Sequence, residues 1–252
     1  MGLGPSASYL AKYNNYVLPG YVQSEDMDST LNIASHYGAY LDGSDSEDIG
    51  LSNKILNLSL KVWETDYLTC KEQVEIASTI IRSSRTFTNL YVQYTDRHYV
   101  ALAKSIKMSK AVPSSVRILD YNVEFECKPW LVGETLHQLS GTSTVSTGDV
   151  GRSGTDALLY GAWTPTVITV TGSNISITGQ TLNGEPTGTI TVSGSVSGLV
   201  IDSEAFTAIE GTTNRNSIMN TDYRMYVGAG ETIFTIAGAS NCTIDYYDRW
   251  YI

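Results

Sequence analysis

Leu199-Val200-Ile201-Asp202-Ser203-Glu204 is the stretch that decides the fold, because it belongs to a series of short runs in which apolar and small polar residues nearly alternate. Alternation of this kind is typical of a β-strand with one buried face. The other runs are residues 166–170, 174–177, 189–192, 232–236 and 242–244. Turn-forming residues lie between them, at Gly172-Ser173, Asn183-Gly184, Ser193-Gly194, Gly228-Ala229-Gly230 and Gly238. Six short strands at this spacing predict an antiparallel β-sandwich over residues 161–252.

The chain has 252 residues, which is enough for two domains, and its charge divides into three regions. Residues 1–50 hold seven acids and one base, residues 51–130 hold eight acids and eleven bases, and residues 131–252 hold eleven acids and four bases. The net charge of −10 argues against a protein that wraps a phosphate backbone, which needs clustered Lys and Arg. No signal peptide and no membrane span are expected from the apolar pattern. Seventeen tyrosines against four phenylalanines favour protein–protein contact surfaces.

The N-terminal half predicts a second β-rich domain over residues 1–130. Residues 55–63 alternate strictly and predict a strand, and residues 89–94 and 98–108 predict a strand pair. Residues 118–127 predict a further strand that ends at Pro129, because proline lacks the amide that a ladder needs.

One helix is expected in this half, beginning at Thr69 as N-cap with Glu72 three residues later as a capping box. Its apolar stripe is predicted to be Val74, Ala77 and Ile81, with Ile76 and Ile80 beside it. The residues 140–148 are rich in Ser, Thr and Gly, and they predict a linker or long loop over residues 131–160.

Residues with catalytic or metal-binding chemistry are sparse. His36, His98 and His137 lie in no metal or nucleophile motif, and His98 is expected to be a half-exposed strand residue. The three cysteines are widely spaced, match no zinc site or disulfide framework, and are expected to be buried as small apolar side chains. They are Cys70, Cys127 and Cys242. We therefore predict no enzyme activity, no metal and no cofactor.

Asp202 and Glu204 are two residues apart, so a strand would place both carboxylates on one face. Such a pair suits a glycosidase, a metal site, or hydrogen bonds that clamp a neighbouring loop. We expect the third of these, in which one carboxylate accepts hydrogen bonds from backbone amides or from Arg224 or Arg249 and so holds a neighbouring loop. The acidic residues 42–48 lack the spacing of an EF-hand, so a solvated turn is expected there rather than a calcium site.

The order of these motifs resembles the C-terminal half of the distal tail proteins (Dit) of long-tailed bacteriophages. That family has a Pro-led strand, a short strand, a hydrophobic-Ile-Asp-Ser/Cys-Glu motif, an Asn-bearing loop, a glycine turn and a final strand with an Arg/aromatic end. The matching segments are Pro165-Thr166-Val167-Ile168, Ile190-Thr191-Val192, Val200-Ile201-Asp202-Ser203-Glu204, Asn214-Arg215-Asn216, Gly228-Ala229-Gly230-Glu231-Thr232-Ile233 and Thr243-Ile244-Asp245-Tyr246-Tyr247-Asp248-Arg249-Trp250-Tyr251.

The N-terminal half is similar to the same family. His36-Tyr37-Gly38-Ala39-Tyr40-Leu41 resembles its turn before the first long strand. Asn122-Val123-Glu124-Phe125-Glu126-Cys127-Lys128-Pro129-Trp130 resembles its last N-domain strand. The resemblance therefore spans about residues 30–252.

The resemblance implies a structural virion protein of the phage tail tip, assembled in the host cytoplasm. Family members form a hexameric ring that joins the tail tube protein to the tail-tip hub protein and often to receptor-binding or side-fibre proteins. The implied fold is mainly β. It has an N-terminal β-sandwich-like ring domain with one helix, which continues the tail tube, and a C-terminal galectin-like antiparallel β-sandwich outside it.

DNA would pass through the lumen of such a ring without binding, so the lumen should repel phosphate over about a Debye length of roughly 8 Å at physiological salt. We predict that acids of the N-terminal half line or rim the channel. The candidates are Glu25, Asp26, Asp28, Asp42, Asp45, Glu47 and Asp48. The alternative is that these acids lie on solvated loops outside the ring.

Two other functions remain open at this point. A carbohydrate-binding β-sandwich module for attachment to the host surface would use Trp163, Trp250, Tyr246 and Tyr247 as an aromatic platform. A glycoside hydrolase would instead be built around Asp202 and Glu204. A six-fold ring is expected only of the tail protein.

Overall fold

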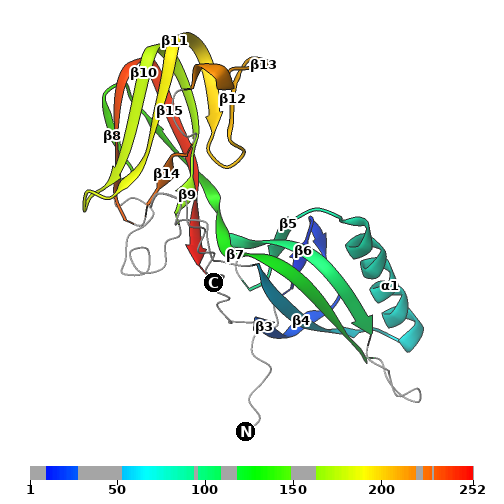
Figure 1. Cartoon of the computed structure of the whole chain (residues 1–252). Coiled ribbons are helices and arrows are strands. Elements are labelled where there is room, and N and C mark those ends of the chain that lie inside the picture. The colour runs from blue at the N-terminus through cyan, green and yellow to red at the C-terminus, as the bar shows by residue number, and fades with distance from the viewer. Residues whose placement is uncertain are drawn as a thin grey trace, which may run out of the picture. The chain divides into compact units, whose positions relative to one another are not determined.

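The computed structural model describes residues 10–27, 53–93, 96–108, 118–148, 163–219, 224–228 and 230–251. The chain divides into two compact units, Met1–Val132 and Gly133–Tyr251. Both consist mainly of antiparallel strands, and the described residues contain one α-helix, so the expected mainly β fold class is confirmed (Figure 1). No helix among the described residues is both long and apolar enough to cross a membrane.

Unit 1 is a twisted antiparallel sheet with the strand order β2-β1-β5-β6-β7-β4-β3. Its elements are β1 (Lys12–Tyr13), β2 (Tyr16–Val17), β3 (Tyr21–Met27), β4 (Lys54–Trp63), α1 (Tyr67–Ser83), β5 (Thr88–Tyr91), β6 (Arg97–Met108) and the first part of β7 (Ile118–Ser140). Leu56, Leu58 and Leu60 of β4 are fully buried, and they alternate with less buried residues as the sequence predicts. The predicted strands 55–63, 89–94 and 98–108 are thus present as β4, β5 and β6.

The helix begins three residues earlier than predicted. Its N-cap is Asp66, whose carboxylate accepts a hydrogen bond from the Thr69 amide at 3.0 Å. This hydrogen bond holds the pKa of Asp66 below its usual value. Thr69 therefore lies inside the first turn, and the predicted capping box with Glu72 is wrong. The predicted stripe is otherwise confirmed, because Val74, Ala77 and Ile81 are buried. Ile76 faces solvent.

The strand β7 continues through Pro129 to Ser140, so the predicted end at Pro129 is wrong. The ladder with β4 ends where Lys54 pairs with Cys127. Pro129 lies beyond that ladder, where a missing amide removes no hydrogen bond to β4. The first ten residues of the predicted linker, 131–140, therefore belong to strand β7. Residues 149–160 of the linker lie outside the described residues. The limits of a ring domain and a linker stay a prediction.

Unit 2 is built from three long strands, β10 (Val167–Thr181), β11 (Pro186–Asp202) and β15 (Thr232–Tyr251), which follow the order β11-β10-β15. The shorter elements are β8 (Thr144–Ser146), β9 (Thr164–Pro165), β12 (Thr207–Glu210), β13 (Thr213–Asn214), the 3-10 helix η1 (Asn216–Ile218) and β14 (Tyr226–Val227). The six predicted apolar runs lie in these strands except for Thr166, which falls between β9 and β10. Their apolar residues form one core that includes Ile177, Ile190 and Phe234.

Three of the five predicted turns are instead β-bulges inside long strands. Register shifts interrupt the β10–β11 and β10–β15 ladders at Gly172, and Gly194 and Gly238 have positive φ within β11 and β15. Asn183-Gly184 forms the predicted hairpin turn between β10 and β11. The predicted turn at residues 228–230 falls between β14 and β15, and its Ala229 lies outside the described residues. A glycine with positive φ suits a bulge as well as a turn, so the residue types alone do not separate the two.

Candidate functional site

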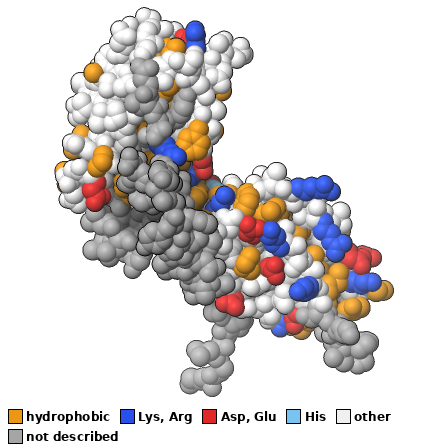
Figure 2. Space-filling view, in the orientation of Figure 1, with side chains coloured by type: hydrophobic (Ala, Val, Ile, Leu, Met, Phe, Trp, Pro, Cys, Tyr) orange, Lys and Arg blue, Asp and Glu red, His pale blue; other side chains and the backbone are white. Residues whose placement is uncertain are grey.

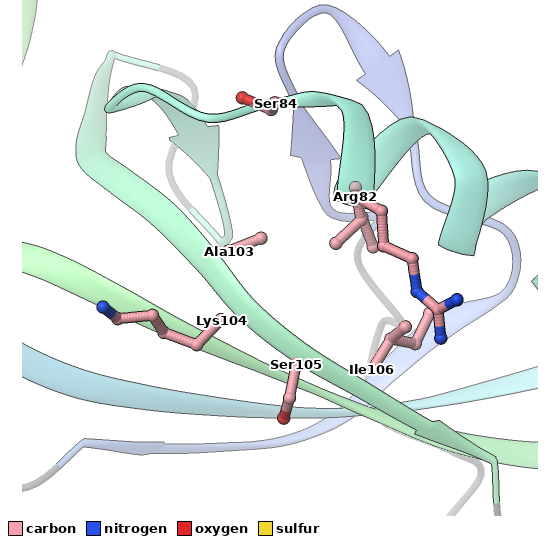
Figure 3. Close-up of a pocket in the computed structure, with 7 residues that line it drawn as sticks. Arg82, Ser84, Ala103, Lys104, Ser105 and Ile106 are labelled. Carbon is pink, nitrogen blue, oxygen red and sulfur yellow. The ribbon is translucent and has the colours of Figure 1, made fainter.

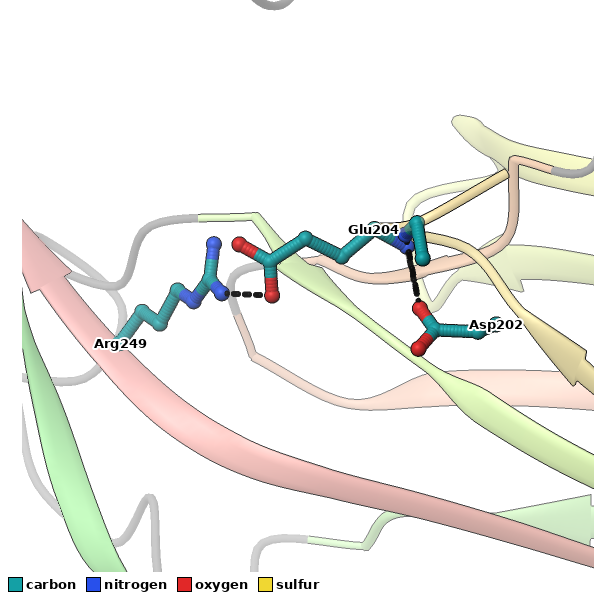
Figure 4. A network of polar contacts seen from close by, with 4 residues as sticks. Asp202, Glu204 and Arg249 are labelled. Carbon is teal, nitrogen blue, oxygen red and sulfur yellow. Dashed lines mark hydrogen bonds and ion pairs between the residues drawn. The ribbon is translucent and has the colours of Figure 1, made fainter. Parts of the chain in front are cut away.

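Asp202 is the last residue of β11, and residues 203–206 form the turn that leads to β12. Its carboxylate oxygen Oδ1 accepts hydrogen bonds from the amides of Glu204 and Ala205, each at 2.9 Å (Figure 4). Since Glu204 lies in the turn, the expectation that both carboxylates share one strand face is wrong. Asp202 stabilises the turn in the way that an N-cap stabilises the start of a helix.

Ser203, between the two acids, is fully buried and joins three segments of unit 2. Its amide donates to the carbonyl of Thr166 at 3.0 Å, and its hydroxyl accepts from the amide of Met225 at 3.2 Å. Thr166 in turn donates to the Met225 carbonyl from its amide at 3.0 Å and from its hydroxyl at 2.9 Å. Neither Ser203 nor Thr166 was predicted from the sequence as a site residue, although both lie in motifs quoted above.

Glu204 is mostly exposed and forms an ion pair with Arg249 of β15, with 2.8 Å between Oε2 and Nη2 (Figure 4). Arg224 contacts the same turn through Phe206, since its guanidinium lies 5.5 Å from the centre of the Phe206 ring. The turn 202–206 is therefore tied to β15 and to the segment before β14. We name these contacts of Asp202, Ser203 and Glu204 the turn clamp, and its structural role stays a proposal.

Replacing Asp202 with alanine is expected to lower the free energy of unfolding by about 1 kcal/mol, as loss of a capping carboxylate does. The effect stays this small because Asp202 is only half-buried, so water can replace the lost acceptor. Asp202→Asn is the matched control, since its amide oxygen still accepts from the backbone and should retain most of the stability. Urea denaturation measures both, and equal losses in the two variants would contradict the assignment.

Two described histidines occupy packed positions. The Nε2 atom of His137 lies 2.9 Å from a carboxylate oxygen of buried Asp248, and its ring stacks on Tyr246 with centroids 5.0 Å apart. His98 is buried beside Tyr91, so the expectation of a half-exposed residue is wrong. His36 lies outside the described residues. Among the described residues, no group of three or more His, Cys, Asp or Glu side chains could hold a metal.

All three cysteines are buried, as expected. Burial raises the pKa of Cys127 to about 12 and that of Cys242 to about 11. These thiols therefore stay protonated near neutral pH, which suits packing rather than nucleophilic chemistry.

The four aromatic residues of the proposed sugar platform do not form one surface. Tyr246 has an exposed fraction of 4%, whereas its neighbour Tyr247 has 43%. Adjacent residues of β15 point to opposite faces, and Tyr246 belongs to the core of unit 2. Trp163 packs edge-on against Tyr226 with ring centroids 6.2 Å apart. A platform that includes Tyr246 is therefore wrong.

Two of the seven candidate lumen acids lie in β3, and the other five fall outside the described residues. Glu25 is half-buried and accepts a hydrogen bond from the Tyr99 hydroxyl at 2.6 Å. Asp26 is exposed. The five others are Asp28, Asp42, Asp45, Glu47 and Asp48. Within β3, Asp26 is thus the more exposed of the two acids, and a place for either of them in a channel stays a prediction.

A hollow of about 340 Å³, which was not predicted from the sequence, lies between the C-terminal end of α1 and β6 (Figure 3). Ile81, Ala103 and Ile106 supply its apolar side chains, and Arg82 and Lys104 its cations. Ser84 and Ser105 complete the lining. The hydrogen bond from Lys104 holds the pKa of Glu126 below its usual value, so Lys104 is already paired within unit 1.

No model of a known protein family matches the chain, and no curated protein matches it. The Dit protein of phage SPP1, described as a paradigm of the hub adsorption apparatus in phages that infect Gram-positive bacteria, matches in fold. Its TM-score is 0.64 at 13% sequence identity, over 96% of this chain and 98% of that chain. The phage P2 baseplate in its activated conformation matches less well. The Ca form has a TM-score of 0.45 at 11% identity, over 94% of this chain and 90% of that chain. The Sr form has a TM-score of 0.44 at 12% identity, over 90% and 89%.

The likeness to SPP1 Dit covers both units, so the chain has the fold of a phage tail-hub protein. More particularly, this is the Dit-like fold that the order of sequence motifs indicated.

Proposed function

We propose that this protein is a structural component of a phage tail tip, a ring of six copies that joins the tail tube to the hub and the receptor-binding apparatus. Unit 1 would form the ring and bind the tail tube protein and the tail-tip hub protein. Unit 2 would lie outside it, where receptor-binding or side-fibre proteins attach. DNA would pass through the lumen, and the protein would reside in the virion.

The observation that carries this proposal is the fold likeness to SPP1 Dit along almost the whole of both chains. Two further observations support it. Two pairs of titratable side chains that the sequence offered to a hydrolase are used in packing and ion pairs, namely His137 with Asp248 and Glu204 with Arg249. The buried Tyr246 also removes the main support for a sugar platform.

The direct test is the mass and shape of the purified full-length chain. Mass photometry should show a species of six times the 27.4 kDa chain, and negative-stain images should show six-fold rings with a central hole. A single-chain species at all concentrations, together with binding to a glycan array, would instead support the carbohydrate-binding module. The full chain should hydrolyse no glycoside, so a rate that Asp202→Ala abolishes would overturn the proposal.

We further propose that acids of residues 1–50 line or rim the lumen, with Glu25 and Asp26 of β3 as their described members. Reversing the charge of both acidic patches, residues 25–28 and 42–48, is expected to slow genome ejection without preventing ring assembly, because Lys side chains would bind passing phosphates. Ejection is measured by release of DNA from phage that carry the variant. Arg215→Glu, a charge change in unit 2, is the control. Unchanged ejection kinetics in the patch variant would place these acids outside the lumen.

A further inference from the structure

We propose that neighbouring copies associate head to tail, with the N-terminal end of α1 of one copy seated in the basic hollow at the other end of α1 of the next copy. The inference rests on the proposed ring and specifies which surfaces of unit 1 would meet in it. The occupant of the hollow is thus a second copy of this chain.

The first surface is apolar and lies where β4 ends and α1 begins. Trp63 has an exposed fraction of 65% and Leu68 one of 68%, and Tyr67 beside them is also exposed. Farther along the helix, Ile76 has an exposed fraction of 53%. Large apolar side chains that gather on a surface mark contact sites, and tryptophan and tyrosine contribute most to such contacts. We name Trp63, Tyr67, Leu68 and Ile76 the apolar end.

Acidic side chains flank the apolar end. Leu68, Glu72 and Ile76 follow one another at intervals of four residues, so they form one row along the outer face of α1. Glu64 lies between Trp63 and the first turn of the helix. Figure 2 shows hydrophobic, acidic and basic side chains side by side over this part of unit 1, at the lower right of the view. The basic Lys71 of α1 is paired with Glu75.

The second surface is the hollow at the C-terminal end of α1, which has the complementary character. Ile81, Ala103 and Ile106 supply the apolar part of a lining that is otherwise polar, and they are the side chains that an inserted Leu or Trp would contact. Arg82 lines it, and Arg85 follows two residues after the end of the helix. Among the described residues, neither arginine is ion-paired with a carboxylate, whereas Lys104 is paired with Glu126.

The two surfaces lie at opposite ends of a 17-residue helix, which is about 25 Å long at 1.5 Å per residue. Two separate, complementary patches on one chain can pair head to tail, and such a contact closes into a ring when its rotation permits. The same patches could also pair reciprocally in a two-fold dimer, and the proposed ring requires the head-to-tail arrangement. Apolar side chains would supply the buried area. The pairing of Glu64 and Glu72 with Arg82 and Arg85 would fix the direction of association.

Charge reversal tests the contact. Variant A carries Arg82→Glu and Arg85→Glu, variant B carries Glu64→Lys and Glu72→Lys, and variant AB carries all four changes. In A both surfaces are acidic and in B both are basic, so each alone should associate on the order of a hundredfold more weakly than the unmodified chain. In AB the charges are exchanged, so rings should form again.

Mixing gives the sharpest result. An equimolar mixture of A and B should form rings in which the two variants alternate. The acidic hollow of A would meet the basic helix end of B, and the basic hollow of B would meet the acidic helix end of A. A ring of six copies permits strict alternation because six is an even number. Mass photometry reads out ring formation, and thermal melting shows whether each variant is folded. Lys12→Glu with Lys128→Glu, which changes the charge of unit 1 equally at positions outside both surfaces, is the control and should form rings.

Two results would overturn the inference. One is ring formation by A or by B alone, and the other is a folded A and B whose mixture stays unassembled. Should a charge variant fail to fold, Trp63→Ser with Leu68→Ser replaces it, since both side chains are exposed, and rings of normal stability would then refute the contact. Absence of rings in the unmodified chain would instead refute the proposed function, so the two failures are distinguishable.

Discussion

Replacing Gly188 with alanine is expected to destabilise unit 2 by about 3 kcal/mol or more. Gly188 has φ +136°, a conformation that L-residues rarely adopt, and it pairs with Gly179 across the β10–β11 ladder. A Cβ built on Gly188 would overlap the carbonyl oxygen of Arg224. The segment 224–225 would have to move away, and Met225 holds the hydrogen bond to Ser203 in the turn clamp.

Gly184→Ala is the matched control for this change. Gly184 also has a positive φ, +84°, but nothing lies within 4 Å of its added Cβ. It should therefore show only the backbone cost of roughly 1 kcal/mol for a left-handed L-residue. Chemical denaturation followed by circular dichroism measures both variants. Equal losses of stability in the two variants would show that the close approach of the Arg224 carbonyl is not what excludes a side chain at position 188.

The strands of this protein could be predicted from the sequence, but their ends could not. Apolar alternation located all six runs of unit 2 because burial of one sheet face imposes it directly. The joining of residues 166–170 and 174–177 into one strand depends on how Gly172 pairs with Val196 and Ala239. Such long-range pairing decides between a bulge and a turn, so the local sequence pattern alone does not predict which of the two forms.

The helix start and the end of β7 were missed for related reasons. Asp66 and Thr69 are both good N-cap residues, and the choice between them depends on where strand β4 ends. Pro129 would end a strand that is paired on that side, but the register of β4 places it beyond the ladder. In both cases the predicted boundary was wrong because the neighbouring element, rather than the local residue type, decided it.

The site was foreseen in part. The sequence indicated that an acid of the Asp202–Glu204 pair would accept from backbone amides or an arginine, and the structure shows Asp202 with two amides and Glu204 with Arg249. Ser203 went unnoticed because a serine in a strand pattern gives no sign of burial. The hollow went unnoticed because the residues of α1 and β6 that line it, such as Ile81 and Ala103, are ordinary and far apart in sequence.

Replacing Phe125 with alanine is expected to lower the stability of unit 1 by about 3–5 kcal/mol, through lost burial and the cavity left behind. Phe125 is fully buried in β7, opposite Leu56 of β4. Its ring lies 5.1 Å from that of Tyr13 at an angle of 55°, so both rings lose a partner. Scanning calorimetry should show the transition of unit 1 moving to lower temperature, and the transition of unit 2 should stay in place.

Trp63→Ala in the same unit provides the contrast, because it removes a larger ring from an exposed position. Stability should change by less than about 0.5 kcal/mol, as for surface substitutions in general. Association of copies should weaken, however, since Trp63 belongs to the apolar end. Phe125→Ala should act in the opposite sense, lowering stability while any folded copies still assemble. A Trp63→Ala variant that melts early but assembles normally would show that this ring is needed for folding, and it would remove the apolar end from the contact between copies.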